Sequence, residues 1–191
     1  MYLLSKPSRS RIEAFLSAQE SQEFSYPNVG ATRGKPPAGF NFDHNRIQLG
    51  EGAEAFARAV QAIRQWKMFD IPWLQICWPD APIREGTAVA VLVSHFGFWS
   101  LNPARIVYVI EENGGSKDYG FAYGTLNGHA ESGEERFAVE LRTDDQSVWY
   151  DLAAFSRPTG LARLGYPFSR TLQRQFIQDS QNAMLRAVAR W

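Results

Sequence analysis

The sequence predicts an α+β protein in which a seven-stranded antiparallel sheet wraps around a long C-terminal helix. The first observation behind this prediction is a series of strand-like stretches between residues 45 and 156, separated by short turns rich in Gly, Asn, Asp and Pro. The second is a helical apolar pattern that follows them and extends to about residue 190. Its apolar face carries Phe168, Leu172, Phe176, Met184 and Val188. Short turns imply antiparallel neighbours, and a helix is the simplest cover for the buried face of such a sheet.

The first elements along the chain are a helix and an irregular connection. Residues 8–19 have a capping serine at Ser8 or Ser10 and apolar residues at helical spacing, so we expect a short helix that packs on the outside of the domain. Residues 24–42 contain three prolines and three glycines, which interrupt regular structure. We expect a long connection there, and the least ordered part of the chain.

Strands and one further helix fill the middle of the chain. Polar and apolar residues alternate over residues 45–49, and the apolar face formed by Phe56, Ile63 and Trp66 predicts a helix over residues 53–66. Six more strands are expected at residues 73–78, 87–96, 105–112, 119–126, 134–142 and 148–156. Turns are expected at Pro79 and Pro82, at Gly86, at Asn102 and Pro103, at residues 113–115, at Asn127 and Gly128, at Asp144 and Asp145, and at residues 161–164.

Length and composition favour one globular domain over residues 1–191. A chain of 191 residues can bury roughly 70% of its unfolded surface in a single core. Hydrophobic residues make up 45% and charged residues 21%, which argues against disorder. Lys plus Arg and Asp plus Glu each total 20, so the formal net charge is zero. We therefore expect no nucleic-acid partner and no attraction to an anionic membrane.

Cysteine usage and hydropathy bear on the compartment. Cys77 is the single cysteine, so neither an intrachain disulfide nor a thiol pair for zinc is possible. No segment approaches the ~20 consecutive apolar residues that span a bilayer, and no apolar stretch of a secretory signal follows the N-terminal Lys and Arg residues. We expect a cytoplasmic protein without a membrane span.

Alternation along the strand at residues 134–142 places one acid among apolar residues. Glu135 shares a face with Phe137 and Val139, whereas Glu134 and Arg136 lie on the other face. Desolvation of Glu135 would raise its pKa unless a cation or hydrogen-bond donors keep it ionised. The alternative is a strand-end acid that remains in water.

The strand at residues 148–156 has two possible inner faces. Tyr150 lies on one face, while Trp149 and Asp151 lie on the other, and either face could be internal. Tyr150 would offer a phenol at the end of an apolar body. An enclosed Asp151 would need a partner such as Arg136 or Arg157.

His129 is the histidine best placed for chemistry. It follows the Gly128 turn beside Glu131, and its unperturbed pKa of about 6.5 suits a general acid or base near neutral pH. A structural turn histidine is the alternative. His44 and His95 lie far away in sequence, and with one cysteine they give no spacing typical of a metal site, so we expect no metal and no cofactor.

Two other patterns are better explained by structure than by chemistry. Cys77 lies in an apolar strand, where a thiol is typically inert, and the chain has no Gly-x-Ser-x-Gly elbow. Gly120, Gly124 and Gly128 recur at four-residue intervals but no helix follows them, which argues against a phosphate loop. They indicate sheet bending or close packing against another element.

Several ordered motifs resemble the uncharacterised protein family 0548. The matching stretches are LGEGAEAFARAV at residues 49–60, QWKMF at 65–69, IVYV at 106–109, GFAYGTLNGHAESGEERF at 120–137, VWYD at 148–151, FSRP at 155–158 and LGYP at 164–167. Together they span most of the chain after residue 24. The resemblance implies a START-like, pollen-allergen-like helix-grip fold with a hydrophobic cavity. It implies no activity, substrate or catalytic residue.

Three functional hypotheses follow. The first is binding of a small, largely hydrophobic molecule in a cavity between the sheet and the C-terminal helix, which the aromatic content of 14% favours. The second is an enzyme, such as a cyclase, hydrolase or isomerase, with Glu135, His129 or Tyr150 as acid or base. The third is a protein-interaction module that uses residues 24–42 or exposed aromatic residues. The candidate site residues are Tyr123, His129, Glu135, Arg136, Trp149, Tyr150 and Arg157.

Overall fold

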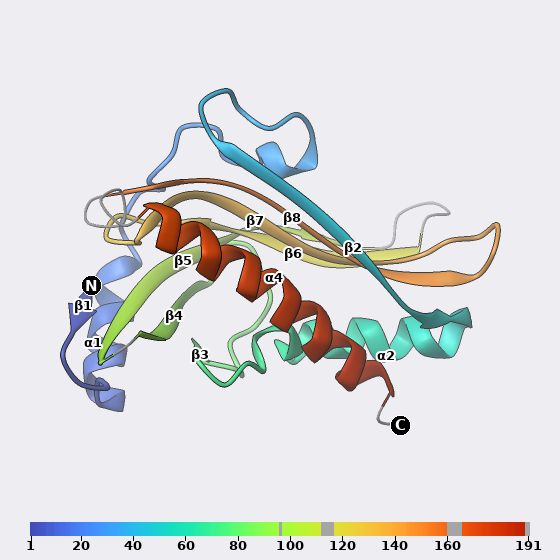
Figure 1. Cartoon of the computed structure of the whole chain (residues 1–191), viewed down its shortest axis with the longest axis horizontal. Helices are drawn as coiled ribbons and strands as arrows, with labels where there is room; N and C mark the ends of the chain where they lie inside the picture. The colour runs from blue at the N-terminus through green and yellow to red at the C-terminus, as the bar shows by residue number, and fades with distance from the viewer. Residues whose placement is uncertain (96, 112–116, 160–165, 190–191) are drawn as a thin grey trace.

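A computed structural model describes residues 1–95, 97–111, 117–159 and 166–189. A curved antiparallel sheet is its main feature, and helix α4 (Tyr166–Ala189) crosses one face of this sheet (Figure 1). Helix α2 (Gly52–Arg64) packs against α4 and against β7 and β8. The two helices therefore share the concave side of the sheet.

The sheet has the order β2-β8-β7-β6-β5-β4-β3, and every neighbouring pair is antiparallel. Its strands are β2 (Asn41–Glu51), β3 (Leu74–Cys77), β4 (Ala88–His95), β5 (Phe98–Ile110), β6 (Lys117–Thr125), β7 (Glu131–Leu141) and β8 (Ser147–Pro158). A two-residue strand, β1 (Tyr2–Leu3), also pairs with β5. The predicted α+β arrangement is confirmed, with one short strand more than the seven expected.

The main core lies between the concave face of the sheet and the two helices. Phe121, Phe137 and Tyr150 project from the sheet and are fully buried. Ile63 of α2 and Met184 of α4 meet them in the same apolar cluster. Burial of each such side chain contributes about 1.5–3 kcal/mol, so the amphipathic helix pattern and the strand alternation stabilise one shared interior.

The helices agree with the sequence patterns to within two residues. Helix α1 (Arg9–Gln19) begins after Ser8, whose Oγ accepts a hydrogen bond of 3.3 Å from the Arg11 backbone N–H. Its buried Ile12 packs near β4 in a second, smaller apolar cluster. Helix α2 ends at Arg64, and Trp66 adopts a left-handed φ of 56° before the 3-10 helix η2 (Lys67–Phe69).

The prediction of a turn at Asn102 and Pro103 is wrong. The chain reverses after His95, and β5 begins at Phe98 and passes straight through both residues. Asn102 is buried, but its Nδ2 donates to the Val91 carbonyl at 3.2 Å, so the polar side chain is satisfied inside the sheet. The pairing of β5 with β6 begins at Ala104, so Pro103 lies just beyond it. The missing N–H of Pro103 therefore costs no hydrogen bond to β6.

The Pro- and Gly-rich connection is folded against the convex face of the sheet, unlike the loose segment expected. Buried Glu134 of β7 accepts hydrogen bonds from Tyr26 Oη at 2.7 Å, from the Gly30 N–H at 2.7 Å and from the Thr32 N–H at 2.9 Å. It also accepts from Thr32 Oγ1. The Glu134 carboxylate thus holds this segment in place around the short 3-10 helix η1 (Ala31–Arg33).

Two of the regularly spaced glycines are sites of close approach. A Cβ at Gly120 would lie 2.2 Å from the Phe137 carbonyl oxygen, and one at Gly124 would lie 2.1 Å from Tyr26 Oη. Their role in close packing is therefore confirmed. The turns predicted at residues 113–115 and 161–164 lie outside the described residues.

Candidate functional site

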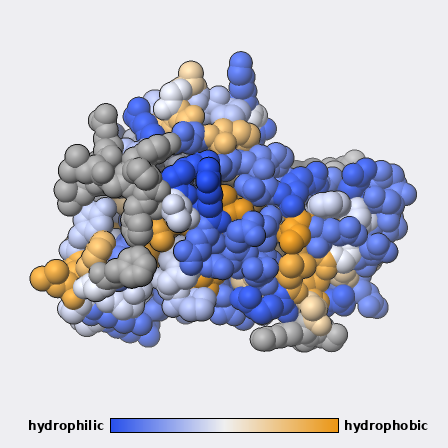
Figure 2. Space-filling view, in the orientation of Figure 1, coloured by the Kyte–Doolittle hydropathy of each residue, from blue (hydrophilic) through white to orange (hydrophobic). Residues whose placement is uncertain are grey.

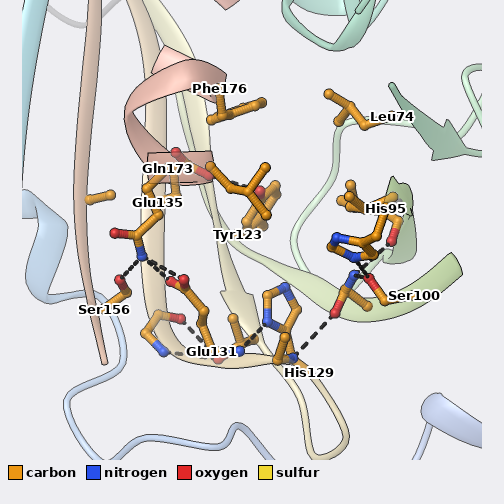
Figure 3. A pocket seen from close by; sticks show the side chains of 18 of the residues that line it. Leu74, His95, Ser100, Tyr123, His129, Glu131, Glu135, Ser156, Gln173 and Phe176 are labelled. Carbon is orange, nitrogen blue, oxygen red and sulfur yellow. Dashed lines mark hydrogen bonds between the residues drawn. The ribbon is translucent and has the colours of Figure 1, made fainter. Parts of the chain in front are cut away.

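A pocket of about 630 Å³ lies between α4 and the sheet, on the side of β4 and β5 (Figure 3). Most of its wall is apolar. The side chains that form this wall include Phe69, Trp73, Leu74, Val93, Leu172 and Phe176. Tyr2 and Leu4 also line the pocket, and they remain 44% and 93% exposed. The N-terminal strand β1 therefore forms part of its rim.

Polar groups in the pocket gather around the first residues of β7 (Figure 3). Glu131 and Glu135 lie on the same face of this strand because their positions differ by an even number. Tyr123 of β6 lies directly beside Glu135 in the strand register, and His129 precedes β7. Gln173 reaches this group from α4.

Glu135 is the acid whose titration is most altered. Its carboxylate accepts a hydrogen bond of 2.8 Å from Tyr123 Oη. Burial raises the pKa of Glu135 to about 8; the Tyr123 hydrogen bond opposes this shift, and the charges of Glu131 and Asp43 add to it. At neutral pH burial thus favours the protonated form of the Glu135 side chain.

Glu131 and Asp43 are each held by a partner. The Gln173 amide donates to Glu131 Oε1 at 2.5 Å and to Ser156 Oγ at 2.9 Å. Arg170 donates to Asp43 Oδ1 at 2.5 Å and forms an ion pair with it. Burial raises the pKa of Glu131, although Ser156, Gln173 and Arg170 oppose this shift. These contacts tie the first described turns of α4 to β2 and β7.

The two histidines of the pocket are attached to different parts of its wall. The Glu131 backbone N–H donates to His129 Nδ1 at 2.9 Å, and burial lowers the pKa of His129 to about 4. His95 Nε2 lies 2.8 Å from Ser100 Oγ, and burial lowers its pKa as well. Burial therefore favours the neutral form of both rings.

The structure brings three of the seven predicted site residues together: Tyr123, His129 and Glu135 line the pocket. Tyr150 shares the concave face but lies deeper in the core, where its Oη is 2.9 Å from Ser180 Oγ. The face of β8 that carries Tyr150 is therefore the inner, concave one. Alternation in the sequence did not determine which face is internal.

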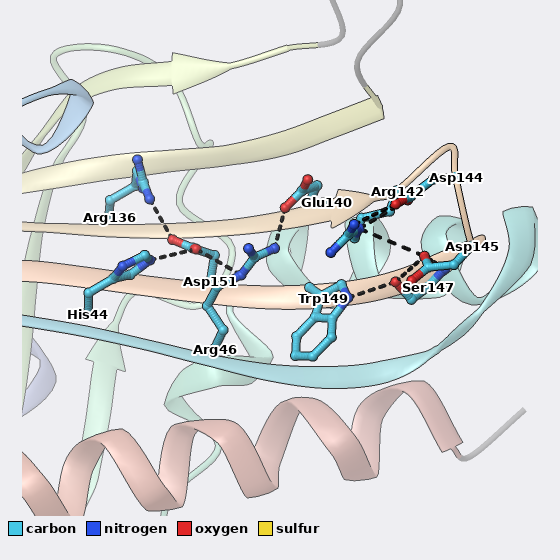
Figure 4. A network of polar contacts seen from close by, with 10 residues as sticks. All are labelled: His44, Arg46, Arg136, Glu140, Arg142, Asp144, Asp145, Ser147, Trp149 and Asp151. Carbon is cyan, nitrogen blue, oxygen red and sulfur yellow. Dashed lines mark hydrogen bonds and ion pairs between the residues drawn. The ribbon is translucent and has the colours of Figure 1, made fainter.

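Arg136, Trp149 and Arg157 lie on the convex face, away from the pocket. Arg136 donates to Asp151 at 2.5 Å, the ion pair expected if Asp151 is enclosed (Figure 4). The Trp149 indole N–H donates to Ser147 Oγ at 2.8 Å (Figure 4). The Arg157 guanidinium stacks 4.7 Å from the centre of the Phe40 ring. Strand parity separates these three residues from the other site residues.

Several pocket residues escaped the sequence analysis. Glu131 has the same parity as Glu135, but the predicted strand began at residue 134, three residues too late to include it. Gln173 and Asp43 come from α4 and β2, and no local pattern in the sequence joins them. Arg170 of α4 pairs with Asp43 of β2, and no local pattern predicts this contact either. A longer β7 would have revealed Glu131, whereas the other contacts require the tertiary fold.

Within the described residues, no group of three or more His, Cys, Asp or Glu side chains is arranged to hold a metal ion. In the same part of the chain, no helix is both long and apolar enough to cross a membrane.

A sheet that grips one long helix and leaves a pocket beside it defines a helix-grip protein. The crystal structure of hypothetical protein jhp0584 from Helicobacter pylori has the same fold, with a TM-score of 0.55 and 14% identity over 85% of this chain and 94% of that chain. Ara h 8.0201 is similar, with a TM-score of 0.52 and 16% identity over 79% of this chain and 99% of its own. The START-like, pollen-allergen-like fold class is therefore confirmed.

Sequence comparison identifies the family. The family model described as "Domain of unknown function (DUF1990)" matches residues 25–183. A UPF0548 protein of Dictyostelium discoideum is 37% identical over 207 residues, which cover 98% of this chain and 96% of that protein. A UPF0548 protein of Deinococcus radiodurans is 34% identical over 201 residues, which cover 98% and 99%. The chain belongs to the UPF0548 family.

Proposed function

We propose that this protein binds a small, largely apolar molecule in the pocket between α4 and the sheet. The observation that carries the proposal is the pocket itself, whose volume of about 630 Å³ and mainly apolar wall match those of small-molecule sites. The polar groups near the start of β7 are few and lie together. Such an arrangement would orient one polar end of a bound molecule while the apolar wall encloses the rest.

Filling the pocket tests the proposal. Ala154 lines the pocket and is the strand partner of Glu135, so Ala154→Phe would place a ring inside the binding space. Ala57→Phe adds the same ring at an exposed position of α2 and is the matched control. Both variants would be screened beside the wild type against a library of lipids and apolar metabolites, by thermal shift and native mass spectrometry.

We expect library compounds that stabilise the wild type and the Ala57→Phe variant but not the folded Ala154→Phe variant. A compound at a hundred times its Kd stabilises the folded state by about 2.7 kcal/mol, which thermal shift detects readily. A library without any stabilising compound counts against the proposal. The same holds if Ala154→Phe and Ala57→Phe bind equally well, because the compound would then occupy another place.

One observation favours a second candidate function, an enzyme that uses acid–base chemistry. Glu135 has a pKa of about 8 in the pocket, which is suited to proton transfer at neutral pH. Incubation with carbonyl compounds in D₂O would reveal removal of a proton from the carbon next to the carbonyl group, read by NMR. Exchange that is no faster than with Glu135→Gln would contradict this candidate.

The interaction-module hypothesis has less support. Among the described residues, the exposed large apolar side chains are Tyr2, Leu4, Val29 and Phe42. Tyr2 and Leu4 belong to the rim of the pocket. In the view of Figure 2 the surface is mainly hydrophilic and its apolar areas are separate from one another. A broad apolar docking face is not visible on this side.

A further inference from the structure

The hydrogen bonds around His129 determine which of its ring nitrogens carries the proton. The Glu131 backbone N–H points at Nδ1 from 2.9 Å. A backbone N–H can only donate, so Nδ1 must present a lone pair, and the proton of the neutral ring is on Nε2. The low pKa of His129, about 4, agrees with this assignment. His129 is therefore a neutral hydrogen-bond donor through Nε2.

The backbone around His129 fixes this donor in place. The His129 N–H donates to the Leu126 carbonyl at 3.2 Å, and its carbonyl accepts from Thr159 Oγ1 at 2.8 Å. Figure 3 shows the ring rising from the start of β7 into the pocket, between Glu131 and the wall that carries His95. Among the described residues, none accepts a hydrogen bond from Nε2. The donor is available to a molecule in the pocket.

Glu135 supplies the second free polar atom of the pocket. Tyr123 Oη donates to Oε2, and no described residue donates a hydrogen bond to Oε1. The ionisable groups that act on Glu135 or on its neighbours are Tyr123 of β6, Glu131 of β7, Asp43 of β2, Tyr150 of β8 and, through Glu131, Arg170 of α4. Burial favours the protonated form of Glu135, and the charges of Glu131 and Asp43 add to this effect, whereas the Tyr123 hydrogen bond opposes it.

The charge of the pocket wall limits the kind of molecule that fits. The acidic side chains on this wall are Asp43, Glu131 and Glu135, and the described lining residues include neither Lys nor Arg. The nearest cations are already engaged: Arg170 pairs with Asp43, and the Met1 ammonium, which acts on His129, donates to the Leu101 and Gly128 carbonyls. A carboxylate or phosphate would lose its hydration there without gaining an unengaged cation, and it would face three acidic side chains, so its binding is disfavoured. A neutral oxygen atom, in contrast, can accept hydrogen bonds from His129 Nε2 and from the protonated Glu135 carboxyl.

We propose that the pocket binds an apolar molecule that ends in a neutral carbonyl-type oxygen, which accepts a hydrogen bond from His129 Nε2 and lies beside Glu135. This inference rests on the proposed binding function and specifies the chemical class of the ligand. It differs from that function because an apolar pocket alone would not distinguish a ketone from a hydrocarbon, an amine or an acid.

Four probes of one shape test the inference. They are 2-acetylnaphthalene, 2-ethylnaphthalene, 2-(aminomethyl)naphthalene and 2-naphthoate, which place a ketone, no polar atom, an ammonium and a carboxylate on the same ring system. Affinities would be measured by tryptophan fluorescence and calorimetry. We expect the ketone to bind about tenfold more tightly than the ethyl compound, the value of one good net hydrogen bond, and the carboxylate to bind least.

Two variants identify the contacts. His129→Phe should remove the preference for the ketone over the ethyl compound, whereas His44→Phe on the convex face should keep it. In the wild type, ketone affinity should fall as the pH rises past about 8, because Glu135 loses the proton that it donates. Glu135→Gln, whose amide always donates, should bind the ketone with an affinity that does not change with pH.

The outcomes separate this inference from the proposed function. Equal affinity for the ethyl compound and the ketone would overturn the inference and leave apolar binding intact. Tighter binding of the amine or the carboxylate, or a ketone preference that survives in folded His129→Phe, would also overturn it. If none of the four probes binds, both proposals fail.

Discussion

Glu134 and Glu135 are consecutive acids that the strand directs to opposite faces of the sheet. Glu134 meets four hydrogen-bond donors on the convex side, from Tyr26, Gly30 and Thr32. Glu135 meets only the Tyr123 hydroxyl among the described residues on the concave side. One residue type therefore holds a loop in place at one position and keeps an available proton at the next.

Glu135 should make the stability of the protein depend on pH. Its pKa is about 8 in the folded protein and 4.5 when the side chain is fully hydrated, so the folded protein binds one more proton between these values. The free energy of unfolding should therefore fall as pH rises from about 5 to about 8, by on the order of 1–3 kcal/mol. Glu135→Gln removes this slope, which urea unfolding at several pH values would measure.

Comparing the wild type with Glu135→Gln separates the contribution of Glu135 to the pH dependence of stability from those of other groups. Glu131, whose pKa is raised, and His129, whose pKa is lowered, also contribute to the pH dependence, but they do so in both proteins. The difference between the two curves therefore reports Glu135 together with its coupling to Glu131 and Asp43. Parallel curves would show that this carboxyl is not desolvated.

Glu134→Gln should release the connection that crosses the convex face. The amide nitrogen cannot accept hydrogen bonds, so at least one buried donor among Tyr26, Gly30 and Thr32 would lose its partner. We expect a loss of about 2–4 kcal/mol in stability and faster hydrogen exchange at the Gly30 and Thr32 amides.

Glu140→Gln is the matched control, because Glu140 lies on the same face of β7 in a partly exposed pair with Arg46. Such a pair contributes at most about 1 kcal/mol. Unchanged amide protection in Glu134→Gln would show that the connection is held mainly by its apolar contacts, such as the ring contact between Tyr26 and Phe155.

At the scale of elements, helix α4 is attached to the sheet by polar contacts at two levels along its length. Near its first described side chains, Gln173 bridges Glu131 and Ser156. In its middle, the buried Ser180 Oγ lies 2.9 Å from Tyr150 Oη of β8. These polar contacts fix how the helix is rotated about its axis, which apolar packing alone determines less strictly.

Tyr150→Phe tests the middle contact. The ring remains, but Ser180 loses its partner in a fully buried place, so we expect a loss of about 1–2 kcal/mol measured by chemical unfolding. In a background that already carries Ser180→Ala, the same substitution should cost less, because no hydroxyl is then left unpaired. Equal costs in both backgrounds would contradict a role for this hydrogen bond.

At the scale of the whole molecule, the order of strands and helices could be predicted because it depends on local patterns. Alternation placed Phe137 and Glu135 on one face, and the 3.6-residue pattern placed Met184 toward the core. The turn predicted at Asn102 and Pro103 was wrong because both residues are tolerated inside β5. The Asn102 amide has a hydrogen-bond partner in Val91, and Pro103, which lacks an N–H, lies next to the end of the ladder with β6.

The site was less predictable than the fold. Tyr123, His129 and Glu135 lie close in sequence and were found together, because adjacent strands of a meander bring them together. Asp43 and Gln173 approach the same place from distant parts of the chain, and only the tertiary structure reveals this. The hydrogen bonds from residues 26–32 to Glu134 were not predicted for the same reason.

The pairing of β2 with β8 has a consequence for how the protein is made. The two strands lie far apart in the sequence: the side chains of His44 and Asp151, which contact each other across this pair, are 107 positions apart. On a ribosome, β2 leaves the exit tunnel well before its partner has been translated, so its hydrogen-bonding edge stays open to other nascent chains. Until β8 emerges and pairs with it, this open edge is the part of the nascent chain most exposed to pairing with other chains.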